Sequence, residues 1–299
     1  MHDGIVILQH RPALPPAIRR HAGAYLFIGP ALVLLVVFNI GPALYTAWLS
    51  LQDYGILGSN GFVGLENYTH ILRDGLFWHS LLVTSIYTVG SAAIGLAGAL
   101  ALAALVTRKL PFMGWFRVLY FIPSVTSLFV NATIFGWLFD YNLGLFNYWL
   151  TSLHLQRAPW LQDPNWALFS VIVVGAWGGV SYNLPIYAAG LQNVNRDLYE
   201  AASLDGANGW QRFRFITLPA IAPITRYTVI LAIIGSFQLV ASIDALTSGG
   251  PENATLVTLM YIRMQGFEFL HFGYASAITL FLLGFLLVVT WLQLRSGSE

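Results

Sequence analysis

Few residues of this 299-residue chain have the types and spacing that catalysis would need. ATP hydrolysis needs a Gly-rich phosphate cradle that ends in Lys and Ser or Thr, but the single lysine, Lys109, lies in Thr-Arg-Lys-Leu-Pro. Cysteine is absent, and the seven histidines lack metal-ligand spacing. We therefore expect no catalytic residues, no metal site and no cofactor bound by this chain.

Polar side chains within long apolar stretches are the stronger sign of function. Such groups are costly in lipid, so they face a cavity or another helix. The candidates are Ser124, Ser127 and Asn131, then Trp177, Tyr182 and Asn183, and finally Ser236, Gln238, Ser242 and Asp244. Hydrogen bonding between helices is the competing explanation for each of them. Asp244, at the outer end of its stretch, is more consistent with a gate or an interhelical ion pair than with a ligand.

The elements that carry these residues are membrane helices. Hydrophobic residues make up 57% of the chain and charged residues only 9%, with a mean hydropathy of +0.67, which excludes a water-soluble monomer. The predicted fold is an all-α membrane protein that forms one transmembrane domain over residues 1–299. Six windows have the length of a span, at about 22–49, 81–106, 118–139, 166–191, 221–246 and 274–294.

The distribution of basic residues predicts the orientation. Eleven Lys and Arg residues lie in the termini and in alternate loops, whereas the other side has Arg73, Arg157 and Arg263. Both termini and the loop 192–220 are therefore expected in the cytoplasm of a multi-pass protein of the bacterial plasma (inner) membrane. The net charge of +1 offers no broad basic surface for nucleic acid.

The loop 192–220 has the most distinctive pattern in the sequence. Good helix formers over 197–204 precede Gly206 and Gly209, and a second amphipathic stretch is expected to end at Pro219. Glu200-Ala201-Ala202, then Gly206, then Ile216 and Leu218-Pro219 have the spacing of the EAA motif. On this motif the chain resembles the permeases of binding-protein-dependent ABC carbohydrate importers, of the maltose and glycerol-phosphate type.

The resemblance implies the type I importer permease fold and a set of partners. These are a second homologous permease, two cytoplasmic ATPase subunits that hold ATP and Mg²⁺, an extracytoplasmic solute-binding protein and the lipid bilayer. It also implies that the EAA loop docks into a groove on an ATPase subunit. The coupling residues it assigns are Glu200, Ala201, Ala202, Asp205 and Gly206.

The resemblance also implies solute contacts. Trp177, Gly179 and Tyr182 match a family stretch that lines a sugar site, Ser236 and Leu239 follow by spacing from Gly249-Gly250-Pro251, and Ser124 matches the outer half of the third span. Gly175 departs from the maltose-type pattern, which has an amide side chain there. With Asn131, Asn183 and Gln238, these residues form the predicted solute site.

The predicted function is ATP-driven import of a disaccharide-sized sugar or glycosylated polyol. The solute is expected to be neutral, because no Lys or Arg lies centrally in a predicted span. Glycerol phosphate or its diesters are the alternative substrates. A six-span carrier driven by an ion gradient and an intramembrane enzyme are the alternative functions.

Overall fold

The computed structural model describes residues 27–107, 120 and 122–295, and it is predominantly helical. In chain order its elements are the π-helical turn η1 (Val36–Ile40), α2 (Gly41–Leu49), β1 (Gln52–Gly55), β2 (Gly58–Phe62), α3 (Glu66–Arg73), α4 (Gly75–Val106), α6 (Leu128–Leu138), α7 (Leu145–Ser152), α8 (Pro164–Gln192), α9 (Arg196–Leu204), α10 (Gly209–Arg212), η2 (Phe213–Thr217), α11 (Leu218–Phe237), α12 (Ala241–Thr247), α13 (Thr258–Arg263), η3 (Met264–Glu268) and α14 (Phe272–Arg295).

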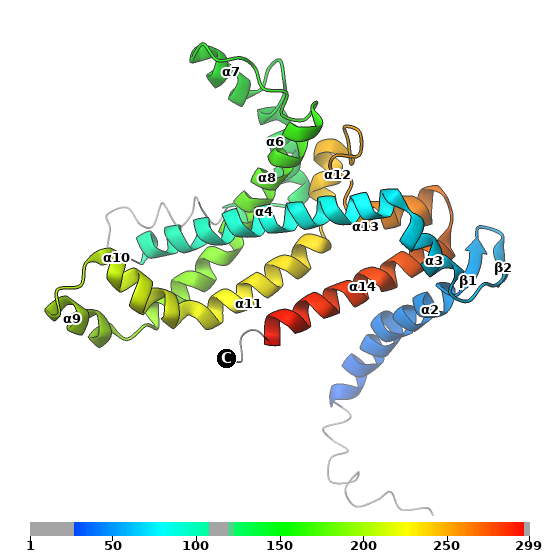
Figure 1. Cartoon of the computed structure of the whole chain (residues 1–299), viewed down its shortest axis with the longest axis horizontal. Helices are drawn as coiled ribbons and strands as arrows, with labels where there is room; N and C mark the ends of the chain where they lie inside the picture. The colour runs from blue at the N-terminus through cyan, green and yellow to red at the C-terminus, as the bar shows by residue number, and fades with distance from the viewer. Residues whose placement is uncertain (1–26, 108–119, 121, 296–299) are drawn as a thin grey trace, which may run out of the picture.

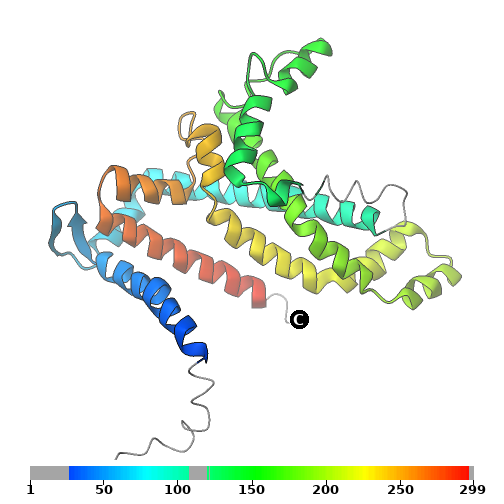
Figure 2. The same ribbon diagram turned by 180° about the vertical axis from the view of Figure 1, so that it is seen from behind.

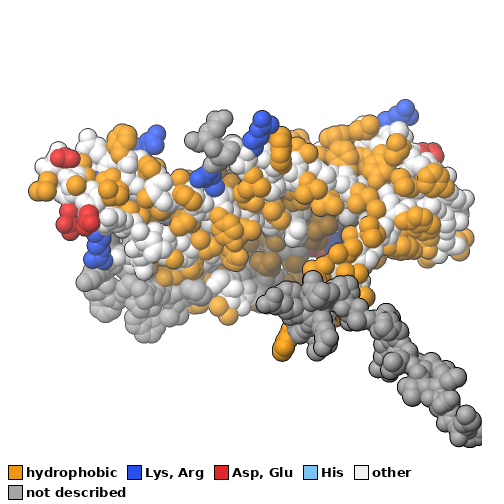
Figure 3. All heavy atoms as spheres, turned by 90° about the horizontal axis from the view of Figure 1, so that it is seen from below, with side chains coloured by type: hydrophobic (Ala, Val, Ile, Leu, Met, Phe, Trp, Pro, Cys, Tyr) orange, Lys and Arg blue, Asp and Glu red, His pale blue; other side chains and the backbone are white. Residues whose placement is uncertain are grey.

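Five helical stretches within the described residues are long and apolar enough to cross a membrane. They are Phe27–Leu49, Gly75–Val106, Pro164–Gln192, Gly209–Phe237 and Phe272–Arg295. Hydrophobic side chains spread over most of the face in Figure 3, and the acidic side chains visible there lie toward the two ends of the molecule. This distribution suits a protein whose middle lies in lipid.

The long helices form one packed group. The helix α4 packs against α8 along much of its length, α11 packs on both, and α14 packs against α2 and α11 (Figure 1). The antiparallel hairpin β1–β2 and α3 lie at one end of the group, whereas α9, α10 and the end of α4 lie at the other (Figures 1 and 2). The short helix α7 projects away from the bundle.

Small residues let α4 and α8 approach closely. A Cβ atom added at Gly95 of α4 would lie 3.2 Å from the carbonyl oxygen of Ala176 and 3.5 Å from the Cα of Gly179. Membrane helices gain no hydrophobic driving force from one another, so such close backbone packing supplies their attraction.

Four predicted spans correspond to long helices with shifted ends. The stretch 81–106 lengthens to α4 because Asp74 caps its N-terminus, with Oδ1 accepting from the backbone N–H groups of Leu76 and Phe77 at 2.9 and 3.1 Å. The stretch 166–191 becomes α8 and 274–294 becomes α14, while the part of 22–49 that is described is helical. Residues 22–26 lie outside the described part.

The third predicted span, 118–139, is wrong as a single helix. Residues 118, 119 and 121 are not described. The helical residues 122–125 end before Ser127, whose ψ of 139° is extended, and α6 begins at Leu128. A continuing helix would bond the carbonyl of Pro123 to the N–H of Ser127. The Asn131 side chain donates to that carbonyl instead, at 3.3 Å.

The fifth predicted span, 221–246, is wrong at both ends. The helix that enters it starts at Gly209 and passes through Pro219, because the π-helical turn η2 absorbs the loss of the proline N–H. Its other end is Phe237, and after a turn at Gln238–Val240 the separate helix α12 carries Asp244. The loop 192–220 is therefore α9, a glycine turn and the first turns of a long helix.

Candidate solute cavity and coupling segment

The segment that carries the EAA pattern folds into a compact, exposed knob, which we define as residues 196–212. The Asn195 side chain caps α9 by accepting from the N–H of Asp197 at 3.0 Å. Asn208 and Gln211 form a reciprocal capping box that starts α10. Both helices of the knob are therefore fixed by local side-chain hydrogen bonds.

Gly206 ends α9 in a left-handed conformation, with φ of +79°. The N–H groups of Gly206 and Ala207 donate to the carbonyls of Ser203 and Ala202 at 3.2 and 2.9 Å. This pair of bonds is a Schellman cap, which favours glycine because an L side chain is strained at positive φ. The glycine spacing in the sequence thus has a conformational cause.

The outer face of the knob has the properties of a docking surface. Glu200, Ala201, Asp205 and Gly206 are exposed, and Ala202 is half-buried. Apolar side chains surround them, with Leu204 90% exposed and Trp210 70% exposed. Solvated apolar groups of this size beside exposed charges suit contact with another protein.

The knob is tied to the long helix that crosses the bundle. Tyr199 and Thr217 share a hydrogen bond between their hydroxyl oxygens at 2.8 Å, and Arg212 donates to the Ser203 hydroxyl at 3.0 Å. From Gly209 the helix runs to Phe237 through η2. A displacement of the knob would therefore be transmitted along this helix toward Ser236.

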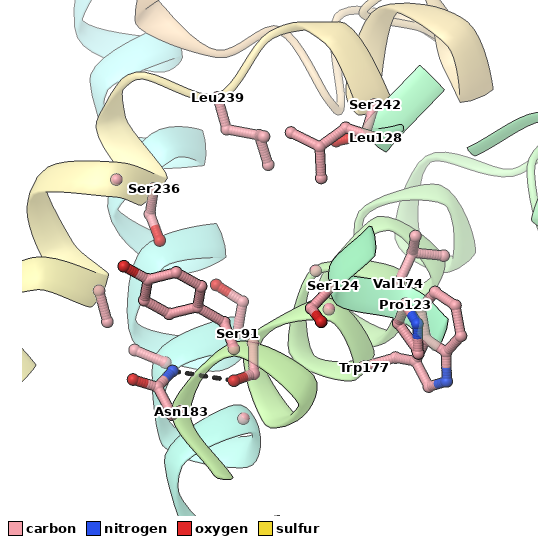
Figure 4. A pocket seen from close by; sticks show the side chains of 18 of the residues that line it. Ser91, Pro123, Ser124, Leu128, Val174, Trp177, Asn183, Ser236, Leu239 and Ser242 are labelled. Atoms are coloured by element: carbon pink, nitrogen blue, oxygen red, sulfur yellow. Dashed lines mark hydrogen bonds between the residues drawn. The ribbon is translucent and has the colours of Figure 1, made fainter. Parts of the chain in front are cut away.

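A cavity of about 530 Å³ lies between α4, α6, α8 and the end of α11. Ser91, Ser124, Asn183 and Ser236 bring polar groups to it from different elements (Figure 4). Among the described residues that line it, none is Asp, Glu, Lys, Arg or His. A lining with hydroxyl, amide and indole groups, and without Asp, Glu, Lys, Arg or His in its described part, suits a neutral, hydroxylated solute.

The cavity brings together most of the predicted solute residues. Those that line it are Ser124, Asn131, Trp177, Gly179, Tyr182, Asn183, Ser236 and Leu239. Gln238 does not line it and is exposed, because it occupies the turn after α11. That turn and the break at Ser127 place Leu239, Ser242 and Leu128 around the cavity.

Three polar residues that line the cavity were missed by the sequence reasoning, and they are Thr126, Tyr87 and Ser91. Tyr87 and Ser91 line it from α4, one helical turn apart. In the sequence they lie inside an apolar span, where an aromatic residue is expected to pack in a core. Only the α-helical i, i+4 spacing of two hydroxyl groups could have indicated a shared face.

Asp244 of α12 pairs with Arg263 of α13, and both short helices lie between α11 and α14 in chain order. The Arg263 guanidinium donates to both carboxylate oxygens, at 2.5 and 3.1 Å, and joins α12 to α13. The two side chains are 32% and 42% exposed, so the pair lies at the surface. This is an interhelical contact, and it also places a charge pair beside the segment that carries Ser242.

A second polar cluster, centred on Asp74, lies at the opposite end from the knob. The Asp74 carboxylate accepts from the hydroxyl groups of Tyr261 and Tyr274, and Gln265 donates to the Tyr261 hydroxyl at 2.8 Å. Desolvation acts to raise the pKa of Asp74, but the bonds from Tyr261, Tyr274 and two backbone N–H groups together lower it. The cluster joins the start of α4 to α13 and α14.

No group of three or more His, Cys, Asp or Glu side chains able to hold a metal ion occurs in the described part of the chain.

Residues 93–297 match the family described as the binding-protein-dependent transport system inner membrane component. The chain belongs to this family. It is accordingly a multi-pass protein of the inner membrane.

Individual relatives agree with this assignment. The chain is 35% identical over 282 residues to the lactose transport system permease protein LacF of Rhizobium radiobacter, covering 92% of this chain and 94% of the relative. It is 32% identical over 275 residues to the sn-glycerol-3-phosphate transport system permease protein UgpA of Agrobacterium fabrum, covering 91% and 93%.

The fold of this family member agrees with a solved importer. The crystal structure of a bacterial alginate ABC transporter, in complex with an alginate pentasaccharide-bound periplasmic protein, contains a chain that matches with a TM-score of 0.84. The identity is 20%, and the match covers 94% of this chain and 96% of that chain. The chain therefore has the type I ABC importer permease fold.

Proposed function

We propose that this chain is the non-catalytic permease subunit of an ATP-driven carbohydrate importer. It would span the membrane six times as one domain, with both termini and the knob in the cytoplasm. A second homologous permease, two ATPase subunits that bind ATP and Mg²⁺, and an extracytoplasmic binding protein would complete the assembly. The family assignment and the names of the relatives support this proposal.

The observation that carries the mechanism is a single helix that connects the exposed knob to the cavity. Glu200, Ala201, Ala202, Asp205 and Gly206 would contact an ATPase subunit, whose ATP-driven movement would shift the helix from Gly209 to Phe237. Ser236 lies one residue before the end of that helix and lines the cavity. Movement of the knob would therefore change the cavity directly.

The proposed solute is a neutral sugar or glycosylated polyol of disaccharide size. The cavity volume of about 530 Å³ falls within the range of about 300–1,000 Å³ typical of small-molecule sites. The relatives' names include both lactose and sn-glycerol-3-phosphate, so identity alone does not choose between them. The lining, without Lys or Arg among its described residues, favours the neutral solute over the phosphate.

The proposal is tested by uptake into proteoliposomes that hold the complete importer and its binding protein. Radiolabelled lactose, trehalose, maltose and sn-glycerol-3-phosphate would be supplied outside, with ATP and Mg²⁺ enclosed. We expect uptake of at least one of the neutral sugars, and none when ATP is omitted. Uptake driven by an ion gradient without ATP would instead support a secondary carrier, and uptake of the phosphate alone would refute the solute class.

A further inference from the structure

Tyr87 occupies a position that links the packing of the bundle to the cavity. It lies on α4, its side chain is only 2% exposed, and it lines the cavity together with Ser91 and Gly95, which follow at one-turn intervals on the same helix face. The face therefore offers two hydroxyl groups and then a glycine that lets α8 approach.

Gly175 on α8 makes room for the Tyr87 side chain. A Cβ atom added at Gly175 would lie 2.2 Å from the Tyr87 hydroxyl oxygen, 2.9 Å from Cζ and 3.0 Å from Cε2. Real Cβ atoms essentially never approach so closely, and the obstacle is a rigid ring among buried neighbours. The Tyr87 ring and a side chain at position 175 are therefore mutually exclusive in this arrangement.

The hydroxyl of Tyr87 is suited to a solute group. It can both donate and accept, as a sugar hydroxyl can. The Ser91 hydroxyl uses part of this capacity, and no charged side chain among the described residues of the lining competes for the rest. A buried tyrosine hydroxyl also gains from a polar partner, because an unmade hydrogen bond is costly in an apolar interior.

We infer that Tyr87 is a solute-binding residue whose hydroxyl bonds one hydroxyl of a neutral sugar, and that Gly175 determines specificity by admitting the Tyr87 ring. The inference rests on the proposed function, because it assigns a contact to the same cavity. A larger residue at position 175 would displace the ring and change which solutes fit.

The first test is Tyr87→Phe, which removes only the hydroxyl. Uptake by the complete importer in proteoliposomes would be measured with the neutral sugar that the wild type transports and with each of its monodeoxy analogues. We expect kcat/KM for the parent sugar to fall about 3- to 10-fold, the range of one neutral hydrogen bond. One monodeoxy analogue lacks the sugar hydroxyl that Tyr87 bonds. Tyr87→Phe and the wild type should transport that analogue equally well.

The matched control is Tyr187→Phe on α8. Tyr187 is as deeply buried as Tyr87, and its hydroxyl bonds Thr228 at 3.2 Å, but it does not line the cavity. We expect any effect of this substitution to be the same for the parent sugar and every analogue. If Tyr87→Phe also lowers uptake of all analogues by one common factor, Tyr87 has a packing role only and the inference is wrong.

The second test is Gly175→Ala, with Gly284→Ala as its control. A Cβ at Gly284, in α14, meets nothing within 4 Å. We expect Gly175→Ala to lower uptake at least 10-fold and Gly284→Ala to leave it unchanged. The double variant Tyr87→Phe/Gly175→Ala should recover part of the loss, because the Tyr87 hydroxyl oxygen that lies 2.2 Å from the added Cβ is absent. Equal losses in the single and double variants would overturn the steric part of the inference.

The outcomes separate this inference from the proposed function. If wild type transports none of the neutral sugars, the proposed function fails before any variant is compared. If wild type transports a neutral sugar but no analogue abolishes the Tyr87→Phe effect, only the Tyr87 contact is refuted.

Discussion

Replacing Gly206 by Ala tests the conformational requirement of the knob. Alanine at a φ of +79° is strained by about 1–2 kcal/mol, and no heavy atom lies within 4 Å of the added Cβ, so a clash adds nothing. The chain must either retain that strain or undo the Schellman cap at the end of α9. By either route, the equilibrium population of the knob conformation that docks falls by about 5- to 30-fold.

We therefore expect Gly206→Ala to lower ATP-driven uptake by about 5- to 30-fold. Because the knob is exposed and locally capped, the thermal unfolding midpoint of the bundle should not change. Asparagine tolerates the left-handed conformation better than alanine, so Gly206→Asn should fall between Gly206→Ala and wild type.

The control is Gly209→Ala, three residues further along the same knob. Gly209 starts α10 without a positive φ, and a Cβ there also meets nothing within 4 Å. Uptake and ATP hydrolysis would be measured in proteoliposomes for all four proteins. If Gly206→Ala matches Gly209→Ala, the left-handed cap is not required for coupling.

Three further predictions concern other parts of the structure. Ala201→Asp, which adds a charge beside Glu200, should lower uptake more than 10-fold while the ATPase subunits continue to hydrolyse ATP; normal uptake would refute the docking role. Asp74→Asn should lower the free energy of unfolding by about 2–3 kcal/mol, measured by denaturation in detergent, because it weakens charge-assisted hydrogen bonds. Since folding lowers the pKa of Asp74, its stabilisation is present above the unfolded pKa of about 4 and is lost as pH falls through the folded pKa; wild type and Asp74→Asn should converge in acid. Asp244→Arg or Arg263→Asp alone should lower uptake, and the two together should restore it; no recovery in the double variant would exclude the pair from gating.

Much of the architecture was predictable because lipid imposes a simple rule on sequence. A spanning helix must be apolar for about 20 residues, so α4, α8 and α14 were recognised, and their exact ends depend on caps such as Asp74 that lie outside the apolar window. The breaks at Ser127 and Gln238 were missed because hydropathy averages over a window and does not detect a backbone turn within it.

The residues that line the cavity were predicted unevenly for a related reason. Spacing places a residue on a helix face, but the rotation of that helix against its neighbours decides whether the face meets a cavity. Trp177 and Asn183 were identified from local pattern, whereas Tyr87 was not, because its place in the cavity depends on its contact with Gly175 of another helix. Gln238 was misplaced by the unpredicted turn. The five proposed coupling residues could be selected together because their spacing is local, and their contact with an ATPase subunit stays a prediction.

Contact between the knob and an ATPase subunit can be measured by the reactivity of a single cysteine. The chain has no cysteine, so Leu204→Cys on the knob and Leu57→Cys on the hairpin, 90% and 98% exposed as leucines, would each be unique. Maleimide labelling would be compared in detergent between the permease alone and its complex with the ATPase subunits, without binding protein. We predict that the complex protects Leu204→Cys and leaves Leu57→Cys fully reactive; equal labelling of Leu204→Cys in both preparations would show that the ATPase subunits do not cover the knob.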